Sequence, residues 1–195
     1  LLVYSLGTIM LPSFETNTLF REQLEIRLGQ GFAGQATFSG LNSGLFWSLL
    51  SNNFLVLLAC FIMALLTGDG AIFLITWNAS VWGTIFGYTA KSASLFSGQS
   101  AFYLFGLIIL IVFPHMMIEG ISYFLAAISG SVISKDVLLE RFASDKFMEV
   151  FGFNLYLFLI ALIFLLVGAG VETFVLEHVG IYQDIIRQSL LSQPV

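Results

Sequence analysis

Long uncharged stretches dominate the hydrophobic pattern of this chain. No Asp, Glu, Lys or Arg occurs between Arg27 and Asp69, between Asp69 and Lys91, between Lys91 and Glu119, or between Glu149 and Glu172. A bilayer core about 30 Å thick requires about 20 helical residues, so each stretch is long enough to cross it. The apolar runs are continuous, whereas membrane β-strands alternate apolar and polar residues. The pattern therefore predicts an all-α fold, a polytopic transmembrane helical bundle.

About five membrane spans are predicted, in a single membrane domain over residues 1–195. We expect the first span to be truncated, because the sequence begins with Leu1 rather than with a methionine. The predicted spans cover residues 1–12, 45–67, 71–90, 101–127 and 150–171. Lys91 is expected to begin a short polar loop after the third of them.

Two charged segments show helical periodicity. In residues 131–149 apolar side chains recur at helical spacing among charged ones, and in residues 19–28 Phe20, Leu24 and Leu28 share one face. This pattern favours short amphipathic helices that lie on the membrane surface. The basic residues divide three against four between the two sides of the membrane, so the positive-inside rule leaves the orientation open.

The composition agrees with a membrane protein and argues against two other classes. Charged residues make up 10% of the chain and hydrophobic residues 58%, whereas soluble domains are about 25% charged. The net charge of −5 argues against a nucleic-acid partner, which requires a basic surface. The lipid bilayer is the expected partner, and the cell membrane is the expected location.

Two ionisable residues interrupt the 101–127 span. A charged side chain within a span costs at least about 2.5 kcal/mol, and such residues usually belong to functional sites. His115 and Glu119 are four positions apart, so they share one face of a helix. Pro114 cannot donate a hydrogen bond to the preceding turn and is expected to kink the helix there. The sequence therefore predicts an intramembrane polar site beside this kink.

Other spans add polar and small residues to the predicted site. Glu172 closes the last span, with Gly168 on the same face. In the 71–90 span, the spacing of Gly83 and Gly87 permits close backbone approach, either within the chain or in a homo-oligomer. We expect an intramembrane polar cluster of Asn78, His115, Glu119 and Glu172, and helix packing at Gly83, Gly87 and Gly168.

Three interpretations of the polar cluster are open. Its members hydrogen-bond across helices and fix the register of the bundle, or they bind a metal, or they form a proton or ion path or a lipid head-group pocket. A metal site would use His115, Glu119 and Glu172, completed by Asn78 or His178, and would suit a divalent ion such as zinc. No other cofactor is expected. Motifs of serine hydrolases, zinc proteases and P-loop enzymes are absent, so an enzymatic activity lacks support.

The run Pro114-His115, with Glu119 soon after, resembles the signature of the stage II sporulation protein M family of integral membrane proteins. That signature is Pro-His-Gly followed by a Glu in the penultimate hydrophobic region. Similar features in the same order are Asn52-Asn53 at the start of a span, Asn78 with Gly83 and Gly87, and Gly170-Val171-Glu172 at the end of the last span. The sequence departs from the family at Met116, where Gly is usual, and at Val175-Leu176, where Thr-Pro is expected.

This resemblance implies a membrane role rather than a defined reaction. The family's namesake is a membrane anchor that recruits peptidoglycan-degrading partners during engulfment, and relatives occur in many bacteria and archaea that do not sporulate. The leading hypothesis is a multi-pass membrane scaffold or membrane-remodelling component with membrane or cell-envelope protein partners. The alternative is a metal-dependent membrane enzyme, or an ion or lipid transporter, that uses the polar cluster.

Overall fold

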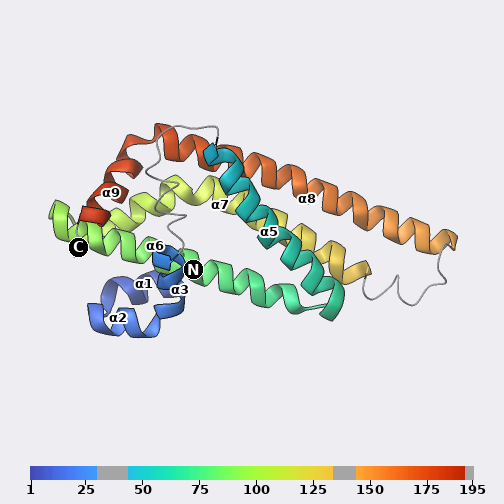
Figure 1. Ribbon diagram of the computed structural model, residues 1–195, viewed down its shortest axis with the longest axis horizontal. Coiled ribbons are helices and arrows are strands. Elements are labelled where there is room, and N and C mark those ends of the chain that lie inside the picture. Colours follow the sequence, from blue (N-terminus) through green and yellow to red (C-terminus); the bar gives the residue numbers. More distant parts are fainter. Residues whose placement is uncertain (30–43, 134–143, 192–195) are drawn as a thin grey trace. The chain divides into compact units, whose positions relative to one another are not determined.

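The computed structural model describes residues 1–29, 44–133 and 144–191. Every element in this part of the chain is an α-helix (Figure 1). In chain order the helices are α1 (Leu2–Met10), α2 (Ser13–Leu19), α3 (Arg21–Gly29), α5 (Gly44–Thr67), α6 (Gly70–Ser97), α7 (Ala101–Val132), α8 (Asp145–His178) and α9 (Gly180–Leu191). The prediction of an all-helical chain is thereby confirmed for the described residues.

Four helices are long and apolar enough to cross a bilayer, namely α5, α6, α7 and α8. They coincide with the predicted spans 45–67, 71–90, 101–127 and 150–171, and the last three helices continue beyond the predicted ends. Helix α1 has nine residues and is not among the four. The count of about five spans is therefore not confirmed.

The polar loop predicted to begin at Lys91 is wrong, because α6 continues to Ser97. The side chain of Lys91 finds partners without leaving the helix: its Nζ donates hydrogen bonds to the backbone carbonyls of Thr8 and Leu11 at the end of α1. A cation beside the last carbonyls of a helix satisfies acceptors that have no partner within that helix. The ammonium group is thus accommodated in an otherwise uncharged segment.

Glycine and hydroxyl side chains set the helix ends. Gly68 has a φ of 78° and follows the last residue of α5, where an L side chain would be strained. The Oγ1 of Thr67 accepts a hydrogen bond of 2.9 Å from the backbone N–H of Gly70, at the start of α6. Ser144 caps α8 in the same way, through a 3.2 Å hydrogen bond from the N–H of Phe147. These local signals explain the tight connection between α5 and α6.

The two predicted amphipathic segments have different outcomes. Residues 19–28 do not form one helix, because the chain breaks at Phe20 between α2 and α3. The carboxylate of Glu25 there accepts a 2.7 Å hydrogen bond from the Nε of Arg21 on an exposed face. Most of the other segment, residues 134–143, lies outside the described residues, so its predicted helix remains a prediction.

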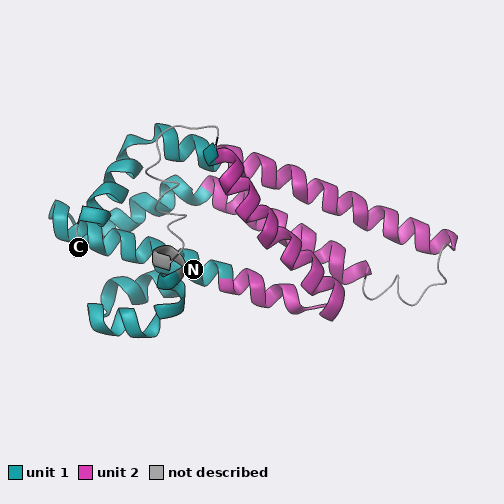
Figure 2. Cartoon of the chain, in the orientation of Figure 1, with its two compact units in different colours: residues 1–45, 78–113, 172–195 teal, residues 46–77, 114–171 magenta. Residues whose placement is uncertain are grey.

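The described contacts divide the chain into two compact units (Figure 2). Unit 1 comprises residues 1–45, 78–113 and 172–195. Its apolar core is built from α1, α6, α7 and α9 and contains Ile9, Ala90, Ala93, Leu104, Phe105, Ile108, Val112 and Ile185. The prediction of one membrane domain over the whole chain stays a prediction, and each unit is described by itself below.

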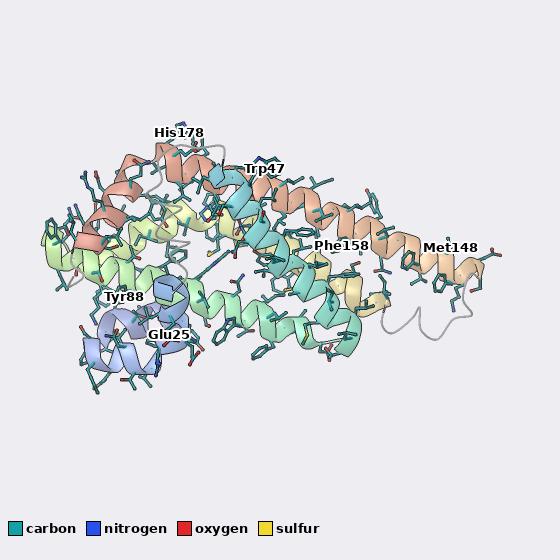
Figure 3. The ribbon with its side chains drawn as sticks, viewed as in Figure 1. Glu25, Trp47, Tyr88, Met148, Phe158 and His178 are labelled. Carbon is teal, nitrogen blue, oxygen red and sulfur yellow. The ribbon has the colours of Figure 1, made fainter. Side chains whose placement is uncertain are left out.

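Unit 2 comprises residues 46–77 and 114–171. Its core joins α5, α6, α7 and α8 through Leu57, Cys60, Ala64, Ala71, Tyr123, Ala126, Ala161 and Leu165. Phe158, labelled in Figure 3, packs at the edge of this core with its ring centroid 4.7 Å from that of Phe61. The small core residues let the helices approach closely, which is typical of membrane bundles.

Candidate functional site

Among the described residues of unit 2, Glu119 is the most deeply buried carboxylate. It lies on α7 and has no exposed surface. The side-chain amide of Asn53, on α5, donates a 2.9 Å hydrogen bond to Glu119 Oε1. Asn53 is itself buried, with 7% of its surface exposed. A buried hydrogen bond between two helices therefore holds this carboxylate in place.

Gly168 brings α8 against the same carboxylate. A Cβ atom at position 168 would lie 2.7 Å from Cγ of Glu119, closer than real Cβ contacts. Only a residue without a side chain allows this approach. Ser122 lies one turn further along α7, and its Oγ donates a 2.7 Å hydrogen bond to the backbone carbonyl of Glu119. Three helices of unit 2 thus meet at Glu119.

His115 and Pro114 precede Glu119 on α7. His115 is 6% exposed, and its Nδ1 atom has no hydrogen-bond partner among the described residues. Its position one turn before Glu119 places both residues on the buried face of the helix. Pro114 lies inside α7, which remains one helix on both sides of it. The predicted kink at Pro114 remains a prediction.

A second buried polar contact connects α7 and α8 in unit 2. The Oγ of Ser129 donates a 2.7 Å hydrogen bond to the backbone carbonyl of Asn154, and the amide of Asn154 donates a 2.8 Å bond to the carbonyl of Val150. Ser129 has no exposed surface and Asn154 only 1%. On the adjacent position, a Cβ at Gly130 would lie 2.4 Å from the carbonyl oxygen of Phe61. The bundle is therefore also tightly packed at this second level.

The other two members of the predicted cluster belong to unit 1. Asn78 on α6 and Glu172 on α8 are both half-buried. His115 and Glu119 belong to unit 2. The structure thus brings His115 and Glu119 together on one helix face, and the four-residue cluster as a whole stays a prediction.

Gly83 and Gly87 are close to the backbone of α1 in unit 1. A Cβ at Gly83 would lie 2.4 Å from the carbonyl oxygen of Leu1, and a Cβ at Gly87 would lie 2.6 Å from that of Ser5. The hydroxyl of Ser5 donates a 2.8 Å hydrogen bond to the carbonyl of Gly83. Within the described chain, this glycine pair is therefore occupied by an internal helix contact.

The metal-site hypothesis receives no added support. Across residues 1–29, 44–133 and 144–191, no group of three or more His, Cys, Asp or Glu residues is arranged to hold a metal ion. His178 stacks on Phe174, with ring centroids 4.6 Å apart, at an exposed position. The proposed use of His115, Glu119 and Glu172 as ligands for zinc stays a prediction. Elemental analysis of the gently purified protein tests it, and a metal content of zero would contradict it.

Sequence reasoning missed which residue bonds to Glu119. The amide that donates to Glu119 belongs to Asn53, which the predicted cluster did not include, and the place of Asn78 in that cluster stays a prediction. The position of Asn53 next to a long apolar run was the available signal, because a polar residue at such a point needs a partner. Ser129 and Asn154 were not predicted to meet, since helical spacing places residues on faces but does not pair helices.

Comparison with protein-family models gives a match over most of the chain. The family model described as Stage II sporulation protein M matches residues 2–175 of the chain. No curated protein and no solved structure matches it. The matched region contains Asn53, His115, Glu119 and Gly168.

Proposed function

Because the chain belongs to the stage II sporulation protein M family, we propose that it is a multi-pass membrane scaffold or membrane-remodelling component of the cell membrane. Four helices with the length and apolar character of membrane spans support this proposal. In this proposal the buried polar contacts of unit 2 are interhelical hydrogen bonds that stabilise one arrangement of the bundle.

The hydrogen bond between Asn53 and Glu119 is the observation that carries the proposal. Both side chains are buried between α5 and α7, while the outward faces of these helices are apolar, as at Leu55 on α5 and Phe124 on α7. A polar pair inside an apolar bundle favours the one packing that satisfies both partners, because any other packing leaves them unpaired. Such a core gives a rigid body on which other proteins can assemble.

Thermal unfolding of the purified protein in detergent tests the stabilising role of these contacts. Glu119→Leu removes the acceptor and is expected to lower the unfolding midpoint, because the amide of Asn53 then loses its partner. Leu159→Ala on the outward face is the control. The Leu159 side chain is 50% exposed, so this substitution removes no buried hydrogen bond. Equal midpoints for wild type and Glu119→Leu would contradict the proposal.

Site-specific photo-crosslinking in cells tests the scaffold role itself. A photoreactive residue at Met148, which is 58% exposed on α8 (Figure 3), is expected to capture a membrane or cell-envelope protein. The same residue at Leu165, which is 1% exposed, serves as the control and should capture only this chain. In the reciprocal experiment, a photoreactive residue placed in the captured protein must crosslink to this chain. Crosslinks to lipid alone from Met148 and from Trp47, a second exposed position, would count against a scaffold.

A further inference from the structure

A stripe of buried polar side chains runs along one face of α7 in unit 2. The stripe consists of His115, Glu119, Ser122 and Ser129, with Ala126 between the serines, and its members recur at steps of three or four residues. None of them exposes more than 6% of its surface. The opposite face of the same helix carries the exposed apolar residues Met117, Ile121, Phe124 and Ile128. The polar residues are therefore directed to the interior of the bundle and not to lipid.

Asn53 and Asn154 extend this stripe to the neighbouring helices. Asn53 meets it at Glu119 and Asn154 meets it at Ser129. We name the six residues His115, Glu119, Ser122, Ser129, Asn53 and Asn154 the polar seam. Measured along the helix, the seam extends from position 115 to position 129, about 21 Å at a rise of about 1.5 Å per residue. All six belong to unit 2.

Hydrogen bonding between helices does not account for every polar atom of the seam. The Nδ1 atom of His115 and the Oδ1 atom of Asn154 are buried and have no hydrogen-bond partner among the described residues. A buried polar atom without a partner is energetically costly and is rare in native proteins. These two atoms lie near the two ends of the seam. Each of them can bond to a small species, such as water, that both donates and accepts hydrogen bonds.

We propose that the polar seam relays protons along the interior of unit 2. Imidazole and carboxyl groups bind and release a proton. The hydroxyls of Ser122 and Ser129 donate to backbone carbonyls, so each must turn from its carbonyl toward a water molecule to pass a proton on. Each step moves one proton between oxygen or nitrogen atoms, with water as the co-reactant, and no bond between heavy atoms forms or breaks. This role goes beyond the proposed scaffold, because a scaffold requires no titratable group.

The spacing of the seam defines the steps of the relay. Along the helix axis the rise from His115 to Glu119 is about 6 Å, and the rise from Glu119 to Ser122 is about 4.5 Å. The interval from Ser122 to Ser129 is longer, about 10.5 Å. Tyr123, which directly follows Ser122, is 2% exposed and carries a hydroxyl group.

In the described core of unit 2, the titratable residues outside the seam are Cys60 and Tyr123. From α5 the core contributes Cys60, and from α8 the facing positions are Gly168 and Ala161. The part of α6 in unit 2, residues 70–77, contains no ionisable residue. Glu119 is therefore the carboxyl group on which the relay depends.

Proton flux into liposomes tests the relay. The full chain is reconstituted into vesicles that contain a pH-sensitive dye, and a potassium gradient with valinomycin drives protons inward. Wild type is expected to raise the rate of internal acidification several-fold over protein-free vesicles. Glu119→Gln is expected to abolish this increase, because an amide still accepts the hydrogen bond from Asn53 but cannot release a proton.

Glu149→Gln is the matched control, because Glu149 is an exposed carboxylate on α8 outside the seam and its loss should leave the flux unchanged. Glu119→Asp keeps a titratable carboxyl group and should restore part of the flux. His115→Gln provides a second interruption of the seam should Glu119→Gln fail to fold. Flux through wild type equal to that of empty vesicles, or unchanged flux in a folded Glu119→Gln or His115→Gln variant, would overturn the relay. The scaffold is judged separately, by unfolding midpoints and crosslinks.

Discussion

The side-chain amide of Asn53 and the carboxylate of Glu119 lie 2.9 Å apart although 66 positions separate them in the sequence. Both are buried, and they join α5 to α7 inside unit 2. In an apolar bundle such a pair defines which helix faces which, because a slipped helix would leave an amide and a carboxyl group unpaired.

Asn53→Ala removes the donor to Glu119. Interhelical hydrogen bonds in membrane bundles contribute about 0.6–1.7 kcal/mol to stability. The free energy of unfolding of this variant is therefore expected to be about 1 kcal/mol lower than that of wild type. Asn52→Ala is the neighbouring control, because Asn52 is exposed and the substitution should have little effect. Equilibrium unfolding in mixed detergent micelles measures both. Equal losses in the two variants would show that the pair with Glu119 contributes nothing specific.

Gly168→Ala places a methyl group 2.7 Å from Cγ of Glu119. Overpacking of this kind costs about 1–3 kcal/mol, because α8 or the carboxylate must move. Gly170→Ala is a stringent control two residues away, where an added Cβ meets no atom within 4 Å. That variant is expected to be neutral or slightly stabilising, since alanine favours helix more than glycine. The measurement is the unfolding midpoint, and the idea fails if Gly168→Ala is as stable as Gly170→Ala.

Gly87→Leu fills the contact between α6 and α1. A Cβ there already lies 2.6 Å from the carbonyl oxygen of Ser5, so a branched side chain must displace α1. Hydrogen exchange followed by mass spectrometry should show faster exchange across α1 than in wild type. Gly106→Leu, on α7, is the control because a Cβ at that position meets nothing within 4 Å. Unchanged protection of α1 in Gly87→Leu would contradict the contact.

Lys91→Met removes the ammonium group that bonds to the carbonyls of Thr8 and Leu11. The end of α1 then loses its side-chain donor, and the amides near that end should exchange faster. Lys91→Arg keeps a cation at the same place and should retain most of the protection. The outcome that speaks against this role is identical exchange in wild type and Lys91→Met.

Much of the local structure could be predicted from the sequence. The uncharged runs predicted four helices that the structure contains, because the length of an apolar run and the thickness of a bilayer are both properties readable along the chain. The turn at Thr67–Gly70 follows from its glycines and its threonine. Lys91 was misjudged as the start of a loop, since its partners on α1 are contributed by residues about 80 positions away.

The sequence by itself determined where four long apolar helices lie, that each is long enough to cross a membrane, and that His115 and Glu119 share a face. These properties depend on composition and on a period of about 3.6 residues. Only the tertiary structure decided that Asn53 bonds to Glu119, that Ser129 meets Asn154, and that Gly168 leaves room for a carboxylate. The physical reason is that each face of a helix, considered alone, could pack equally well against several other helices. The choice among them depends on the packing and hydrogen bonding of all helices together.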